Sequence, residues 1–367
     1  MKINKKAGWL ALAMLVFALI ICSIVWFGRG KKDDKVIIGV IFPGAISESG
    51  WNGTHYAGLK QACDELGAEL LVYENVPEYS GKCKEAVQEL AKRKAGAIIL
   101  ESFNYPEEIK DTIDAHPEID FFCCSFTNDE RNYTPYFARV YQARYLSGVV
   151  AGLRTTTNHI GYVAAMDNSE VNRGLNSFAL GVRSVNPEAV IHVTYTGAWD
   201  DREKEISETR MIVEKCNADV IAYHQNQPFV VEAAVELGVD VIGYNVGQVS
   251  NSSHLLTSVA SNWDMVYREI IRDHMSDREM DGKIYWLGIE KDAVSLAFYS
   301  DLVSQEIRDT VAYTKEQLIQ SREVFSGLIY DNNGVMRCNE NEVIRDEILL
   351  GEMDWLVEGV EVYGEKE

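Results

Sequence analysis

The chain alternates short apolar runs with longer amphipathic segments over most of its length. VIIGVIF at residues 36–42 is a continuous apolar run typical of a buried parallel strand, and residues 51–66 follow it with the spacing of a helix. Further strand-like runs are AELLVYEN, AGAIILES and DFFCCSF, with the helical KCKEAVQELAKR between the first two. This alternation is typical of β-α-β units around a parallel sheet, so we expect an α/β fold.

A second series of the same kind begins after a helix-like segment at residues 142–155. Its expected strands are HIGYVAAM, VIHVTYTG, DVIAYHQ and DVIGYNVG, and helical segments separate them. Two similar series predict two lobes of similar construction. Residues 36–145 with about 262–300 form the first lobe, and residues 146–261 with about 301–367 form the second. The tail contains strand-like AVSLAFY and a helix around residues 315–322; it is too short for a third lobe, so we expect it to complete the other two.

Residues 1–35 are expected to form a separate membrane segment and linker. Three lysines precede an uncharged apolar stretch from Ala7 to Phe27. About 20 apolar residues suffice to cross a bilayer as a helix, whereas the apolar core of a secretory signal is usually about 7–15 residues long and ends at small residues. Because this stretch ends in Ile-Val-Trp-Phe, we expect one uncleaved transmembrane helix; a cleaved signal is the alternative.

Composition and motifs exclude several classes of function. The formal net charge of −21 argues against a nucleic-acid partner, because a polyanion would be repelled. The seven cysteines have no metal-ligand spacing, so we interpret them as buried free thiols. The sequence contains no nucleophile elbow, phosphate loop or H-E-x-x-H helix, and no G-x-G-x-x-G follows the first strand. We therefore expect no enzyme, no catalytic residue, no cofactor and no metal.

Polar and aromatic residues gather where the expected strands end. The carboxyl ends of parallel strands form the edge of an α/β sheet at which ligands bind. Aromatic faces combined with amide and carboxylate groups suit a flat ligand that has several hydrogen-bonding edges. The candidate ligand-binding residues are Glu48, Trp51, Asn52, His55, Asp167, Trp199, Gln225, Asn226 and Asn245.

The stretch SEVNRGLNSFALGVRSVNPEAVIHVTYTGAWDD at residues 169–201 resembles the basic membrane protein family, as do GWNGTHYAGLK before it and HQNQP, VIGYN and LTSVASNWD after it. These proteins are the substrate-binding components of ABC transporters and include purine nucleoside receptors. The resemblance extends from about residue 36 to residue 303. It implies a type I periplasmic-binding-protein fold, in which the chain crosses a hinge three times and the ligand lies between two lobes. It also implies ABC permease subunits as partners and a binding domain outside the cytoplasmic membrane.

The resemblance assigns roles to individual residues. Trp51 takes the position of the aromatic residue that stacks on the purine base, and Asn52 that of the Asn following it. Asn245 stands where an Asp usually contacts the sugar. Ser261 stands where nucleoside-binding members carry a Lys that would hold the ribose hydroxyls. A free base such as adenine or hypoxanthine is therefore as compatible with this sequence as a nucleoside.

Together these features predict a membrane-tethered extracytoplasmic receptor. We expect it to capture a purine-like small molecule, either a nucleobase or a nucleoside, and to deliver it to the permease without chemical change. A sensor of the same fold that signals to a membrane partner is an alternative, and so is a sugar-binding protein. A nucleoside-processing enzyme is less favoured, because the sequence has no clustered acidic metal site and no nucleophile motif.

Overall fold

The computed structural model describes residues 35–47, 50–124, 133–245, 253–276, 278, 282–320 and 323–364. Residues 37–367 belong to one compact unit, which is described below. No helix within the described ranges is both long enough and apolar enough to cross a membrane. The stretch from Ala7 to Phe27 lies outside those ranges, so the transmembrane helix stays a prediction.

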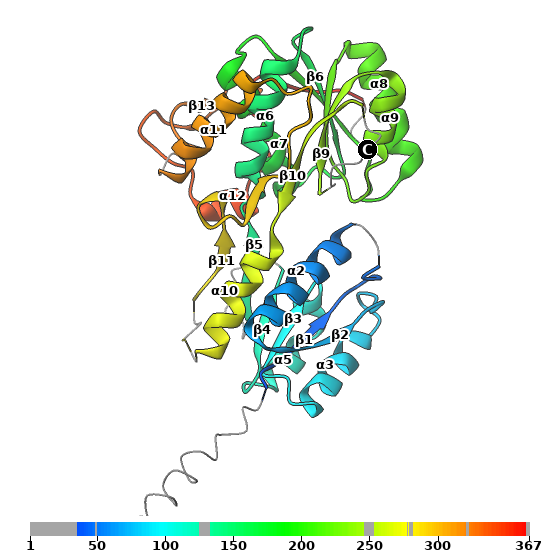
Figure 1. Ribbon diagram of the computed structural model, residues 1–367, viewed down its shortest axis with the longest axis vertical. Coiled ribbons are helices and arrows are strands. Elements are labelled where there is room, and N and C mark those ends of the chain that lie inside the picture. Colours follow the sequence, from blue (N-terminus) through cyan, green and yellow to red (C-terminus); the bar gives the residue numbers. More distant parts are fainter. Residues whose placement is uncertain are drawn as a thin grey trace, which may run out of the picture. The chain divides into compact units, whose positions relative to one another are not determined.

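The first sheet is entirely parallel and has six strands in the order β11-β5-β4-β3-β1-β2. In chain order they are β1 (Ile37–Ile41), β2 (Glu69–Tyr73), β3 (Ala97–Leu100), β4 (Asp120–Cys123), β5 (Tyr133–Ala138) and β11 (Tyr285–Leu287). Helices cover both faces of this sheet, with α2 and α10 side by side on one face and α3 on the other (Figure 1). The helices of this part are α2 (Trp51–Leu66), α3 (Lys82–Lys92), α4 (Tyr105–Glu108), α5 (Lys110–Asp114) and α10 (Trp263–Met275).

The second sheet has seven strands in the order β12-β10-β9-β8-β6-β7-β15, and only the β10–β12 pair is antiparallel. Its strands are β6 (His159–Ala164), β7 (Val190–Tyr195), β8 (Val220–His224), β9 (Asp240–Tyr244), β10 (Leu255–Ser261), β12 (Val294–Leu296) and β15 (Val360–Val362). The accompanying helices are α6 (Val140–Arg154), α7 (Ser169–Val185), α8 (Arg202–Cys216), α9 (Phe229–Leu237), α11 (Gln305–Ile319) and α12 (Asp346–Gly351). A short 3-10 turn (Ile289–Lys291) and the hairpin β13 (Ile329–Tyr330) and β14 (Met336–Cys338) complete the described tail.

The chain passes between the two sheets three times, as the family resemblance implies. The passages lie between β5 and α6, between β10 and α10, and between β11 and β12. The strands expected in both series are present as β1 to β4 and β6 to β9, so the predicted α/β fold with parallel sheets is confirmed. The lobe boundaries stay a prediction; the strands change sheet for the third time between Leu287 and Val294.

Helices α6 and α7 pack with their backbones almost touching. A Cβ atom added to Gly181 would lie 2.1 Å from the carbonyl oxygen of Tyr145, and one added to Gly148 would lie 2.1 Å from that of Phe178. Real side chains do not tolerate such distances, so only glycine lets the two helices approach this closely. The contact fixes α7, whose first turn reaches the site described next.

Candidate ligand-binding site

A cavity of about 670 Å³ lies at the carboxyl ends of strands from both sheets. Ligand pockets for small molecules usually measure about 300–1,000 Å³. The first sheet and its connections contribute Pro43, Trp51, Glu78, Glu101, Ser102, Phe103, Cys124 and Phe137. The second sheet and the tail contribute Asn168, Ser169, Glu170, Arg173, Trp199, Leu350 and Gly351. The cavity thus combines aromatic faces with carboxylate, hydroxyl and amide groups.

Trp51 is the first residue of α2 and is held by other rings. Its ring stacks on Phe137 with centroids 6.0 Å apart and an interplanar angle of 27°. It also contacts the imidazole of His55 at 4.1 Å and the edge of Trp263 at 5.7 Å. A ring fixed on several sides loses little conformational entropy when a ligand binds, so Trp51 is a preorganised stacking surface.

The Glu101 carboxylate is buried in a network of hydrogen bonds in the wall of the cavity. Its Oε1 accepts from the hydroxyls of both Tyr136 and Tyr267. His55 Nδ1 lies 2.6 Å from the Tyr267 hydroxyl and 3.0 Å from Glu101 Oε2. Burial raises the pKa of both tyrosines well above the usual range, and the negative charge of Glu101 adds to the shift. The hydroxyls therefore remain protonated and act as donors to Glu101.

The first turn of α7 supplies the facing wall. Asn168 caps this helix, because its Oδ1 accepts from the backbone N–H of Val171 at 3.0 Å. Burial raises the pKa of Glu170 in the same turn, while the positive charge of Arg173 opposes the shift. Arg173 Nη1 donates to the Leu349 carbonyl at 2.7 Å, which ties α7 to α12. The tail therefore helps to build the cavity through α12.

Asn226 connects the two tryptophans of the cavity. Its side-chain Oδ1 accepts from the backbone N–H of Trp51 at 3.2 Å, and its backbone N–H donates to the backbone carbonyl of Trp199 at 2.9 Å. The residue before α2 is Gly50, which has no side chain with which to cap the helix. A Cβ atom at Gly50 would lie 2.7 Å from Asn226 Oδ1. Helix α2 of the first sheet is thus capped by a residue that follows β8 of the second.

Two of the candidate residues from the sequence, Trp51 and Trp199, line the cavity. His55 lies in the Glu101 network, and Asn226 holds α2 as described. The Oδ1 atom of Asn52 is buried and has no hydrogen-bond partner among the described residues. Glu48 lies outside the described residues.

The remaining candidates make contacts within the second sheet's part of the chain. Asp167 accepts from Asn172 Nδ2 at 2.8 Å, Gln225 Nε2 donates to Thr196 Oγ1 at 2.9 Å, and Asn245 Oδ1 accepts from the N–H of Ser261 at 3.3 Å. These bonds occupy one polar atom of each side chain. Their participation in ligand binding stays a prediction.

Several lining residues were not among the candidates. Glu170 and Arg173 belong to the SEVNRG run and follow the end of β6. Asp167 was a candidate because it follows the end of an expected strand, and the same reasoning applies to these two residues. Phe137 lies on β5, a strand that the apolar pattern did not predict. Leu350 and Gly351 come from the tail, where the local sequence carries no signal of a binding site.

Comparison with known proteins decides the family. A family model described as ABC transporter substrate-binding protein PnrA-like matches residues 35–326. The chain belongs to this family. The family consists of solute-binding proteins of ABC transporters and not of enzymes, which confirms the predicted class of function.

The relatives of this chain differ in the ligands named for them. The chain is 29% identical to TsgA13 of Haloferax volcanii, a candidate ABC transporter glucose-binding protein, over 91% of this chain and 82% of that protein. It is 25% identical to a purine-binding protein of Brucella abortus over 94% of this chain and 99% of that protein. A solved ABC transporter solute-binding protein of Conexibacter woesei has the same fold, with a TM-score of 0.65 and 18% identity over 78% of this chain and 96% of that one.

Proposed function

We propose that this protein captures a purine-like ligand, a nucleobase or a nucleoside, in the cavity between its two sheets and delivers it to an ABC permease. The observation that carries the proposal is the combination of four aromatic residues with carboxylates around one cavity: Trp51, Phe103, Phe137 and Trp199 beside Glu78, Glu101 and Glu170. The similarity to a purine-binding protein over nearly the whole chain supports it.

The chemistry of the lining matches a purine base. An aromatic pair contributes about 0.5–1.5 kcal/mol beyond the burial of its area, and a purine offers two flat faces for such pairs. The edges of the base carry N–H donors, for which carboxylate oxygens are strong acceptors. Glu170 lies in the first turn of α7, on the wall that faces Trp51 and Phe137. Its carboxylate can accept from one edge of the base.

The charge of the lining disfavours phosphorylated ligands. The described lining residues carry three carboxylates and one guanidinium, and that guanidinium, Arg173, already donates to a backbone carbonyl. A phosphate would meet this net negative charge, and the repulsion between like charges is unfavourable. The proposal is therefore a base or nucleoside and not a nucleotide.

The proposed receptor works outside the cytoplasmic membrane, as solute-binding components of ABC transporters do. We propose that the apolar stretch from Ala7 to Phe27 tethers it there, with the N-terminus inside and the binding domain outside. Ligand occupancy would then stabilise the arrangement of the two sheets that the permease recognises.

A sugar is the second candidate ligand. It is favoured by the similarity to TsgA13, which is named as a candidate glucose-binding protein. Aromatic faces with carboxylates also bind the apolar face and the hydroxyls of a sugar ring.

A thermal-shift panel separates these ligands. The protein would be melted with adenine, hypoxanthine, adenosine, inosine, glucose and ribose, each under identical conditions. A ligand that binds only the folded state at a hundredfold excess over its Kd stabilises by about 2.7 kcal/mol, which raises Tm by several degrees. We expect a purine base or nucleoside to give this shift. A shift with sugars alone would replace the proposal by the sugar candidate, and no shift at all would refute both.

A further inference from the structure

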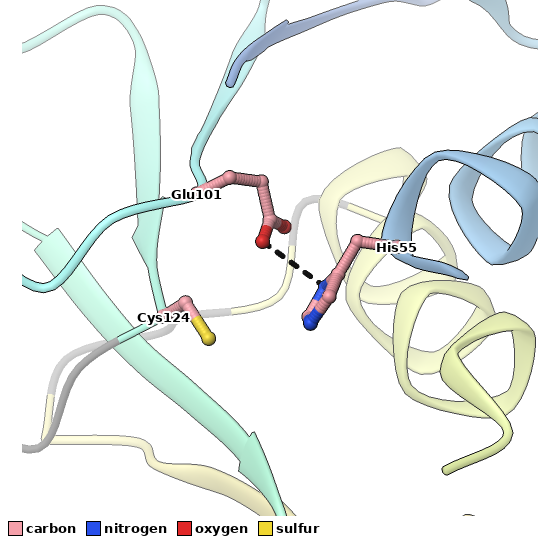
Figure 2. Close-up of side chains that lie close together, drawn as sticks. All are labelled: His55, Glu101 and Cys124. Carbon is pink, nitrogen blue, oxygen red and sulfur yellow. Dashed lines mark ion pairs between the residues drawn. The ribbon is translucent and has the colours of Figure 1, made fainter. Parts of the chain in front are cut away.

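A group of three potential metal ligands lies in the wall of the cavity. His55 comes from α2, Glu101 follows β3 directly and Cys124 follows β4 directly. One nitrogen, one carboxylate oxygen and the sulfur of these side chains all lie within 4.8 Å of one another. Figure 2 shows the imidazole, the carboxylate and the thiol pointing toward a common space. The three residues are far apart in the sequence, so no spacing motif reveals them.

Two polar atoms of this group lack the hydrogen bonds that buried atoms normally make. His55 and Glu101 are 0% and 1% exposed. His55 Nε2 has no hydrogen-bond partner within the described part of the chain, and Glu101 Oε2 receives no hydrogen bond there either, although it lies 3.0 Å from His55 Nδ1. Leaving a buried polar atom unsatisfied costs about 1–3 kcal/mol. A bound ion that is coordinated by His55 Nε2 and by Glu101 Oε2 would remove this cost.

The neighbours of these two atoms orient them as the surroundings of a metal site do. Oε1 of Glu101 accepts from the hydroxyls of Tyr136 and Tyr267, and Oε2 lies 3.0 Å from His55 Nδ1, so a further lone pair of Oε2 is left for an ion. Nδ1 of His55 faces both the Tyr267 hydroxyl and Glu101 Oε2, which leaves Nε2 as the ligand nitrogen, and the ring is fixed by stacking on Trp263 at 3.8 Å. Hydrogen bonds of this kind fix the tautomer and orientation of metal ligands.

We propose that His55, Glu101 and Cys124 bind a zinc ion. Zinc accepts nitrogen, oxygen and sulfur ligands together, whereas calcium and magnesium take oxygen ligands. On binding, the thiol proton of Cys124 is released to solvent, because zinc binds the thiolate. Glu101 and Cys124 line the cavity, so the ion has a route of entry and its fourth position is open to the cavity. The proposal does not depend on which solute the protein transports.

Cobalt substitution tests the site. The purified full-length protein would be stripped of metal with a chelator and titrated with Co²⁺, then with Zn²⁺ in competition. We expect a 1:1 complex with a thiolate-to-cobalt charge-transfer band in the near ultraviolet, which Zn²⁺ abolishes. Cys124→Ser replaces a single atom and should lose the band and at least tenfold of the zinc affinity. Glu101→Gln should keep the band but also bind at least tenfold more weakly.

Cys63→Ser is the matched control, because Cys63 is a buried free thiol of α2 outside this group. It should leave the band and the affinity unchanged. No band in the unsubstituted protein, or an unchanged band in Cys124→Ser, would overturn the proposal and leave a purely hydrogen-bonded network. Adenine binding measured in the presence of chelator is a separate readout: if it persists without a cobalt band, only the metal site is refuted.

Discussion

At the scale of single residues, Glu205 on α8 is a buried acid that the site does not use. Its side chain is 0% exposed, and neither carboxylate oxygen has a hydrogen-bond partner among the residues described. Burial raises its pKa from about 4.5 to about 8, and the negative charges of Asp200 and Asp201 add to the shift. The folded protein therefore keeps this carboxyl protonated at neutral pH.

Glu205→Gln should stabilise the protein at high pH and have little effect at low pH. Below about pH 4.5 the carboxyl is protonated in both the folded and the unfolded state, so it causes no penalty. As the pH rises from about 4.5 to about 8, the unfolded state loses this proton while the folded state retains it, so the free energy of unfolding falls. Glutamine has no carboxyl proton to lose, so Glu205→Gln removes this decrease in the free energy of unfolding.

The check is Tm measured at pH 4.5 and pH 8 for the unsubstituted protein, for Glu205→Gln and for Glu203→Gln, an exposed neighbour on the same helix. We expect Glu205→Gln to raise Tm by several degrees at pH 8 only, and Glu203→Gln to leave Tm unchanged. An equal effect of Glu205→Gln at both pH values would contradict the explanation.

At the scale of elements, the sequence predicts what local patterns determine. Buried strands such as β1 and β6 were predicted because they are continuous apolar runs. Strand β5 was missed since it contains Pro135 and mixes aromatic with polar residues, and β11 is only three residues long. Helix α11 begins at Gln305, ten residues before the expected start, because Ser304 caps it by accepting from Ile307 N–H at 3.3 Å.

The contact between α6 and α7 gives a second prediction. Gly181→Ala would place a methyl group 2.1 Å from the Tyr145 carbonyl oxygen, so the helices must move apart. Overpacking of this kind usually costs about 1–3 kcal/mol. Chemical denaturation should show this loss for Gly181→Ala. Gly351→Ala is the control, because apart from its chain neighbours and the backbone of its own helix no described heavy atom lies within 4 Å of its added Cβ. Equal stability of the two variants would refute the tight contact.

The cap that Asn226 provides for α2 gives a third prediction. Removing an N-cap acceptor costs about 1 kcal/mol, and here the acceptor comes from the part of the chain that faces α2 across the cavity. Asn226→Ala should therefore weaken ligand binding about fivefold, as measured by titration calorimetry. Asn226→Asp retains the acceptor and should bind nearly as well as the unsubstituted protein. Equal affinities of the alanine and aspartate variants would rule out this role.

At the scale of the whole molecule, the site is assembled from segments that no local pattern connects. Trp51 and Trp199 could be predicted since each follows the end of a strand. The contributions of Phe137 and of α12 depend on strand order and on where the tail returns, which are properties of the tertiary structure. The fold was therefore more predictable than the site, because strand and helix periodicity is local whereas the walls of the cavity are not.

Calorimetric titration of the purified protein with adenine, with and without Trp51→Ala, is the most direct test of the central claim. Tyr313→Ala, an exposed aromatic residue of α11 outside the cavity, is the control. We predict a single site for adenine, an affinity at least tenfold lower in Trp51→Ala, consistent with base stacking worth about 1–3 kcal/mol, and no change in Tyr313→Ala. Equal affinity in Trp51→Ala, or no binding of any purine beside clear binding of glucose, would contradict the account.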